Sequence, residues 1–134
     1  MKERKNSLYP PDWIKYARKD WKRIFAMLNS DDMEGAAFFI QQALEKYLKA
    51  FMLQQGWFLR KIHDLDALLD DATKYNPSLE SFRRFCKRVS GYYLIERYPA
   101  PTLLDLNRME IERDIKEAKG FVLMMFPGEE LKDA

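Results

Sequence analysis

Residues 33–51, MEGAAFFIQQALEKYLKAF, decide the fold. Apolar residues recur there every three or four positions, the spacing of a helix that buries one face. This stripe comprises Met33, Ala36, Ala37, Ile40, Ala43, Leu44, Tyr47, Leu48 and Phe51. Phe38 and Phe39 widen the apolar surface beyond one stripe, so neighbours must contact the helix from more than one side. We predict a central helix, capped within residues 30–32 and closed by Gly56.

Four more helices are predicted around this one. Apolar spacing and the positions of prolines place them at residues 10–29, 64–75, 78–96 and 104–126. In the fourth helix of the chain, the inner face is expected to comprise Leu79, Phe82, Cys86, Val89 and Tyr93. The pattern predicts an all-α fold, an antiparallel up-and-down helical bundle of about five helices. A single domain would cover residues 1–134, with an ordered core over about 10–127 and a polar tail over 128–134.

The charge and cysteine content exclude several classes of protein. The chain has 23 Lys and Arg against 21 Asp and Glu, and a net charge of +2 is too small for a whole-chain nucleic-acid footprint. The single cysteine, Cys86, excludes a disulfide framework and a cysteine-rich zinc site. The longest uncharged runs, residues 35–44 and 50–59, are too short to cross a membrane. We expect a cytoplasmic protein without membrane contact.

A basic face is predicted on the 78–96 helix. It comprises Arg83, Arg84, Lys87 and Arg88. Their spacing of i, i+1, i+4 and i+5 places them together, opposite the apolar stripe. Such a face is either a docking surface for phosphates or an ordinary solvated surface, and charge runs on amphipathic helices favour the second interpretation.

Two groups of residues suggest metal or acid–base chemistry, and each has a simpler interpretation. His63 is the only histidine and precedes Asp64, but one histidine cannot supply the remaining ligands of a typical zinc site. A structural or capping role is favoured. Asp66 and Asp70 lie one helical turn apart and could hold Mg²⁺, yet no glycine-rich phosphate loop accompanies them, so a solvated acidic face is favoured. We predict no metal site and no cofactor, and we read Cys86 as a buried apolar residue.

Aromatic residues surround an arginine near the end of the 78–96 helix. Tyr92, Tyr93 and Tyr98 flank Arg97 in sequence, and aromatic rings beside a guanidinium can stack a nucleobase. Buried tyrosines at a helix end explain the same pattern equally well.

Three stretches recur together in one known family. They are residues 41–50, QQALEKYLKA, residues 63–65, HDL, and residues 96–99, ERYP. In order and spacing they resemble the motifs of the HEPN family (higher eukaryotes and prokaryotes nucleotide-binding), and the resemblance covers nearly the whole chain. The residues that carry it are Gln42, Glu45, Lys46, His63, Asp64, Arg97, Tyr98 and Pro99.

The resemblance implies a helical bundle that often forms a homodimer, a nucleotide- or RNA-related role, and a separate minimal nucleotidyltransferase as partner. Many members of the family are ribonucleases, several of them toxins, with an arginine followed by four to six residues and then a histidine. This chain departs from that motif. The positions required before His63 hold Gly56, Trp57 and Phe58, and no histidine follows Arg97.

We therefore expect a non-catalytic, dimeric module that binds a nucleotide or RNA and acts with a nucleotidyltransferase partner. The candidate base and phosphate contacts are Arg97, Tyr93, Tyr98, Lys46 and Lys49. Arg97 would either fasten the turn before Pro99 or bind a phosphate with both guanidinium nitrogens. Two alternatives remain: a ribonuclease toxin of a toxin–antitoxin pair that uses His63 in a non-standard site, and a purely structural interaction protein.

Overall fold

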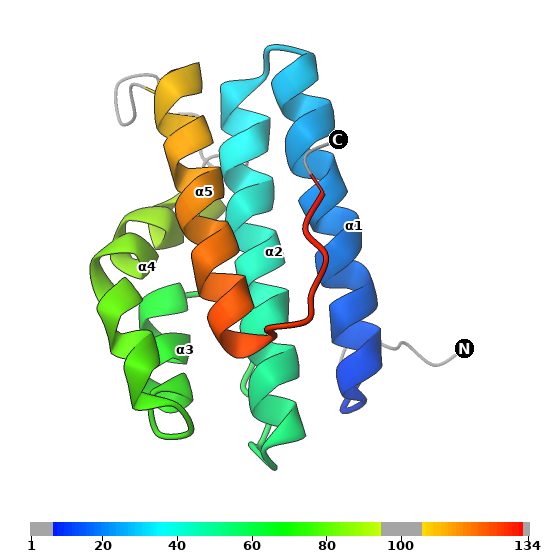
Figure 1. The fold of residues 1–134 in the computed structure, drawn as a ribbon, viewed down its shortest axis with the longest axis vertical. Helices are drawn as coiled ribbons and strands as arrows, with labels where there is room; N and C mark the ends of the chain where they lie inside the picture. The colour runs from blue at the N-terminus through cyan, green and yellow to red at the C-terminus, as the bar shows by residue number, and fades with distance from the viewer. Residues whose placement is uncertain (1–6, 95–105, 133–134) are drawn as a thin grey trace.

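The computed structural model of the chain describes residues 7–94 and 106–132 (Figure 1). Within these ranges it contains five α-helices, two short 3₁₀ helices and no strand. The elements are α1 (Pro10–Asn29), α2 (Met33–Gln54), α3 (Leu65–Ala72), η1 (Pro77–Phe82), α4 (Arg83–Ser90), η2 (Gly91–Leu94) and α5 (Arg108–Met125). The all-α helical bundle predicted from the sequence is confirmed.

The turn between α1 and α2 is built from capping residues. The side chain of Asp32 caps α2 by accepting a hydrogen bond from the backbone N–H of Gly35. A Cβ atom on Gly35 would lie 2.6 Å from Oδ2 of Asp32 and 2.8 Å from Sδ of Met27. A side chain at residue 35 would therefore displace the Asp32 carboxylate that makes the cap, which favours glycine at this position. At the other end of α2, Gly56 adopts a φ of 90°, which ends the helix where predicted.

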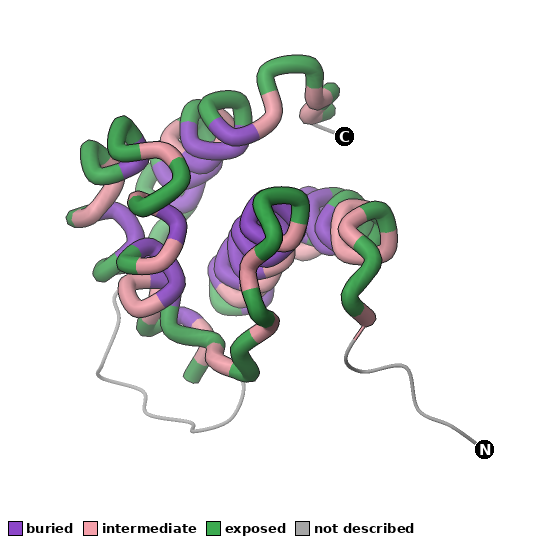
Figure 2. The backbone as a smooth tube through the Cα atoms, turned by 90° about the horizontal axis from the view of Figure 1, so that it is seen from below, coloured by how far each residue is buried: buried purple, intermediate pink, exposed green. Residues whose placement is uncertain are grey.

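α2 is the central helix, as the sequence predicted. It contacts α1, α3, α4, α5 and η2, and its buried residues face these neighbours (Figure 2). α1 runs antiparallel to α2, whereas α5 runs beside α2 in the same direction (Figure 1). Arg108 fixes the start of α5 next to the α1–α2 turn, because its guanidinium donates to the carbonyl of Leu28 (2.8 Å) and pairs with Asp31 (3.3 Å).

One continuous helix was predicted over residues 78–96, and this prediction was wrong. The described part of this segment consists of three shorter helices. A 3₁₀ turn, η1, precedes α4, and a second one, η2, follows it. Pro77 starts η1, and the hydroxyl of Ser81 donates to the carbonyl of Ser78, which competes with regular helical bonding. Because a 3₁₀ turn has fewer residues per turn than an α-helix, each segment changes the register of the side chains.

The register change alters which residues reach the core. Leu79, Cys86 and Val89 are buried as predicted. Phe85 and Tyr92 are also buried, whereas Phe82 and Tyr93, which the unbroken helix placed on the inner face, are only partly buried. This correction brings Tyr93 to a surface where it can contact a ligand.

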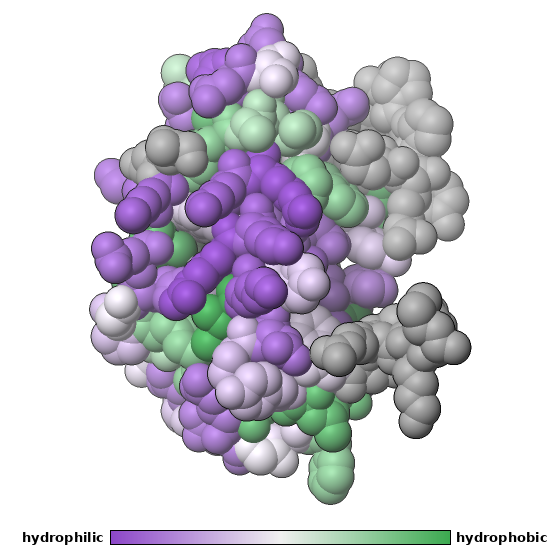
Figure 3. All heavy atoms as spheres, turned by 90° about the vertical axis from the view of Figure 1, so that its right-hand side faces the viewer, coloured by the Kyte–Doolittle hydropathy of each residue, from purple (hydrophilic) through white to green (hydrophobic). Residues whose placement is uncertain are grey.

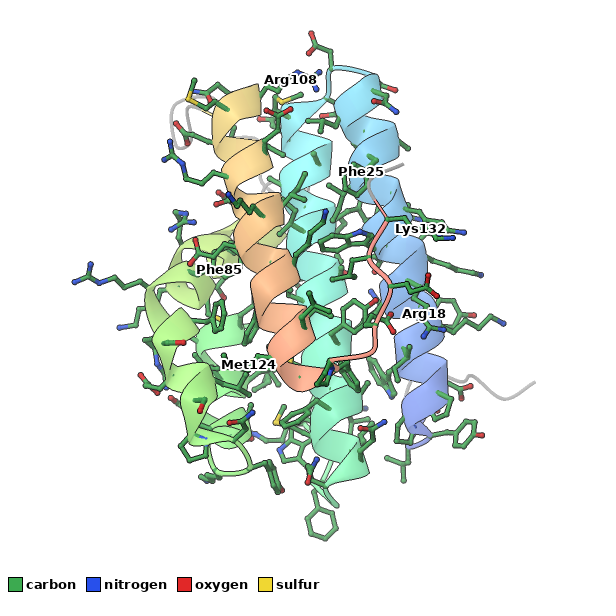
Figure 4. The ribbon with its side chains drawn as sticks, viewed as in Figure 1. Arg18, Phe25, Phe85, Arg108, Met124 and Lys132 are labelled. Carbon is green, nitrogen blue, oxygen red and sulfur yellow. The ribbon has the colours of Figure 1, made fainter. Side chains whose placement is uncertain are left out.

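The segment after α5 packs against the helical core. We call residues 126–132 the C-terminal strap. It crosses α1 and α2 (Figure 1), and the guanidinium of Arg18 lies beside it (Figure 4). Nε and Nη2 of Arg18 donate to the two carboxylate oxygens of Glu129 (2.8 and 2.9 Å), and the hydroxyl of Tyr47 donates to the same carboxylate (2.6 Å). Most of the polar tail set apart in the sequence is therefore attached to the bundle.

The substitution Glu129→Gln is expected to lower the free energy of unfolding by about 1–2 kcal/mol at neutral pH, because it removes a charge-assisted contact. The hydrogen bonds from Arg18 hold the pKa of Glu129 below its usual value. This stabilisation is therefore present above the unfolded-state pKa of about 4.3 and is lost as the pH falls through the lower folded-state pKa.

Urea denaturation between pH 3 and 7 measures both effects. The matched control is Glu130→Gln at the exposed neighbouring residue, for which we expect little change. Equal losses in the two variants would show that the strap contact contributes nothing specific.

Candidate functional site

A pair of side chains, Glu45 of α2 and His63 of the loop before α3, organises the candidate site. Nδ1 of His63 lies 3.1 and 3.0 Å from the two carboxylate oxygens of Glu45. One turn earlier on α2, the amide of Gln41 donates to the backbone carbonyl of His63 (2.8 Å). The helix therefore holds both the ring and the backbone of His63, while the side chain of Asp64 caps α3.

The Glu45 carboxylate is buried and also binds a buried lysine. Nζ of Lys49 donates to Glu45 across 2.9 Å, and the two side chains are only 4% and 6% exposed. The ammonium group also lies over the ring of Trp13, 5.3 Å from its centroid. A buried charge pair of this kind is stable only while both partners are present.

An aromatic stack covers one side of His63. The rings of His63 and Tyr93 are nearly parallel, with centroids 4.5 Å apart and planes 14° apart. The His63 side chain nevertheless remains 47% exposed. The two rings therefore form an aromatic surface that is partly open to solvent.

This surface belongs to an open cavity of about 770 Å³, which we call the His63 pocket. Its walls include Lys61, Ile62, His63, Lys87, Tyr93 and Leu94. The pocket also contains two carboxylates that already have partners. Asp64 accepts hydrogen bonds from Ser90 (2.7 Å) and from the backbone of Asp66 (3.0 Å), and Asp66 pairs with Arg83 (2.7 Å).

Two members of the predicted basic face make strong internal ion pairs. The Arg83 guanidinium meets the carboxylates of Asp66, Asp70 and Glu80 at 2.7, 2.7 and 2.8 Å. The hydrogen bonds to Glu80 and Asp66 raise the pKa of Arg83 above its usual value. The pair Asp66 and Asp70, considered above as a Mg²⁺ site or a solvated face, thus holds an arginine.

At the other end of the basic face, Arg88 is also held by an internal ion pair. Arg88 pairs with the buried carboxylate of Asp114 (2.6 Å), which also accepts a hydrogen bond from Tyr92 (2.7 Å). Arg84 and Lys87 have no ion pair within residues 7–94 and 106–132. Only Lys87 of the predicted four lines the His63 pocket.

The α2 residues of the family motif form a chain of hydrogen bonds. Lys46 pairs with the buried carboxylate of Asp20 on α1 and donates to Gln42, and Gln42 donates to Gln41. Gln41 donates in turn to Glu45 (3.2 Å). Both lysines predicted as phosphate contacts, Lys46 and Lys49, are therefore paired with carboxylates.

The remaining predicted site residues separate into two groups. Tyr93, His63 and Asp64 come together at the His63 pocket. Arg97, Tyr98 and Pro99 lie outside the described residues. Cys86 is buried, and burial raises the pKa of its thiol to about 12, so the thiolate needed for nucleophilic chemistry is suppressed.

Sequence reasoning missed Lys61 as a pocket residue and Asp20 as a buried partner. The i, i+4 spacing of Glu45 and Lys49 inside an apolar helix was the available signal for a buried ion pair. Nothing local in the sequence indicated that Lys61 would lie near Lys87. Their proximity depends on the path of the loop after α2.

A second group of cations, also overlooked in the sequence, lies on α1. Lys15, Lys19 and Lys22 are exposed on this helix, and the side of the molecule that Figure 3 presents is largely hydrophilic. Lys15 and Lys19 lie over the ring of Tyr16, at 6.0 and 4.8 Å from its centroid.

Within the described ranges, no group of three or more His, Cys, Asp or Glu side chains is arranged to hold a metal ion. No helix in the same ranges has the length and apolar character needed to cross a membrane.

Comparison with known proteins gives one match. The family model described as HEPN domain matches residues 11–129, which is most of the chain. No curated protein and no solved structure matches the chain.

The substitution Glu45→Gln is expected to lower the free energy of unfolding by about 3–5 kcal/mol, because it leaves Lys49 buried without a carboxylate. Urea denaturation at neutral pH is the measurement. Glu112→Gln, at an exposed position on α5, is the matched control and should stay within about 0.5 kcal/mol of the wild type. A loss below about 1 kcal/mol for Glu45→Gln would contradict the importance of the buried pair.

Proposed function

Because this chain belongs to the HEPN family, we propose that it is a non-catalytic module that binds a nucleotide or RNA, acting as a homodimer with a separate minimal nucleotidyltransferase. Family membership supports a nucleotide- or RNA-related role in broad terms. The observation that carries the finer proposal is the His63 pocket, where an aromatic surface and two lysines meet and no described lining residue is an arginine.

The chemistry of RNA cleavage supports a protein that binds RNA without cleaving it. In the ribonuclease motif of the family, an arginine and a histidine act as a pair that activates the ribose 2′-hydroxyl and stabilises the phosphorane, so cleavage needs both residues in place. The motif positions before His63 hold Gly56, Trp57 and Phe58. Arg60, the nearest arginine in sequence, pairs with Asp71 (2.9 Å) and does not line the pocket.

A specific observation also favours the alternative, a ribonuclease toxin of a toxin–antitoxin pair. The carboxylate of Glu45 orients a half-exposed imidazole, as carboxylates do for histidines that act as general bases. The two proposals differ in one measurable property, the cleavage of RNA.

The homodimer is supported by apolar side chains at the surface. Phe58 is 91% exposed, Met109 69% and Leu8 68%, and each would be removed from water if an interface formed over it. Light scattering at tens of micromolar should give twice the 16.0 kDa mass of the chain. The mass of a monomer would remove the dimer from the proposal, and mass spectrometry of the same preparation, purified from its native cell, would identify a nucleotidyltransferase partner.

We expect the purified protein to bind single-stranded RNA and to leave it intact, with or without divalent metal ions. Gel analysis of end-labelled RNA after long incubation is the measurement. Cleavage that His63→Ala abolishes would replace this proposal with the toxin alternative. Cleavage that persists in His63→Ala would indicate a contaminating nuclease.

A further inference from the structure

One face of the His63 imidazole is available to a ligand. Tyr93 covers one face of the ring, and Glu45 meets its Nδ1 edge. Because the side chain is still 47% exposed with Tyr93 on one face and Glu45 at Nδ1, we take the opposite face to be the part of the ring that a ligand can reach. A nucleobase placed on that face would extend the Tyr93–His63 pair into a stack of three rings, and such stacking strengthens the binding of any base because every base has a flat π face.

Two lysines supply positive charge to the same pocket. Lys61 comes from the loop after α2 and Lys87 from α4. Both are exposed, and neither makes a hydrogen bond or ion pair within residues 7–94 and 106–132. Lys87 interacts electrostatically with Glu80, but no hydrogen bond from a described residue holds either ammonium group, so both can bind phosphate.

The acidic groups of the pocket have partners other than these two lysines. Asp66 pairs with Arg83, which also pairs with Asp70 and Glu80, and Asp64 accepts hydrogen bonds from Ser90 and from the backbone at the start of α3. The hydroxyl of Ser90 also accepts a hydrogen bond from the backbone N–H of Leu65 (2.9 Å). These contacts join the wall that carries Lys61 and His63 to the wall that carries Lys87, so the pocket is formed in advance of binding.

We propose that the His63 pocket accepts one unpaired nucleotide, with the base stacked on the free face of His63 and the phosphate bound by Lys61 and Lys87. This inference rests on the binding function proposed above. The volume of about 770 Å³ lies in the range of small-ligand sites. A base inside a duplex is already stacked on its neighbours, so the ligand is a free nucleotide or an unpaired nucleotide of RNA. Glu45 acts as a positioning residue that holds the ring.

The test compares two double variants that remove equal charge from exposed lysines. One is Lys61→Ala with Lys87→Ala in the pocket, and the control is Lys19→Ala with Lys22→Ala on α1. Uridine monophosphate and a short single-stranded RNA are titrated into each folded protein. We expect the pocket variant to bind uridine monophosphate about 10-fold or more weakly than wild type, while the control changes little. Ribose 5-phosphate, which lacks the base, should bind wild type about 5-fold or more weakly than uridine monophosphate.

The outcomes distinguish failure of the proposed site from failure of the proposed binding function. If ligand binding weakens equally in both double variants, or does not weaken in the pocket variant, the proposed site is wrong. The proposed binding function still stands in that case, provided that the wild type binds nucleotide or RNA. Wild type that binds neither nucleotide nor RNA overturns both. Equal affinity for ribose 5-phosphate and uridine monophosphate overturns the stacking. If the pocket substitutions weaken RNA binding and the mononucleotide does not bind, the site is supported with RNA as the source of the nucleotide.

Discussion

A carboxylate buried in the middle of α2 constrains the rest of the structure. Every other α-helix of the described chain contacts α2, and Glu45 is buried among these helices. Such a charge is stable only when it is paired and hydrogen-bonded. Lys49 supplies the opposite charge, and His63 supplies a further hydrogen bond from a loop distant in sequence.

This constraint links stability to the candidate site. The loop after α2 must return to the helix, because His63 satisfies Glu45 through its ring and Gln41 through its carbonyl. The return places the imidazole against Tyr93 at the entrance to the pocket. The same contacts that keep the core electrically balanced therefore fix the orientation of the surface proposed to bind a base.

The sequence predicted the features that depend on local pattern. The apolar stripe of α2 identified the central helix, and glycine and aspartate at its ends marked the boundaries. It could not predict the break of residues 77–94 into three segments, because Ser81 bonding to Ser78 and the 3₁₀ turns compete with an otherwise helical pattern by small energies.

The site itself was only partly visible in the sequence. Tyr93 and His63 were both candidates, but their stacking depends on the path of a loop and on a register set by η2. The basic face was read as four cations, whereas Asp66 and Asp114, which pair with Arg83 and Arg88, lie 17 and 26 residues away from them in the chain. Helical spacing indicates which side chains share a face and contains no information on such partners.

The position of the hydrogen on the His63 ring tests the structural argument most directly. His63 is the only histidine in the chain, so its ring nitrogens give a single set of signals in a long-range ¹H–¹⁵N correlation spectrum. If Glu45 accepts a hydrogen bond from the ring, Nδ1 must carry a hydrogen in the native protein, and that hydrogen should no longer be fixed on Nδ1 in unfolded chains. A native spectrum with the hydrogen on Nε2 alone would contradict the Glu45–His63 contact on which the fold of the loop and the proposed binding surface both depend.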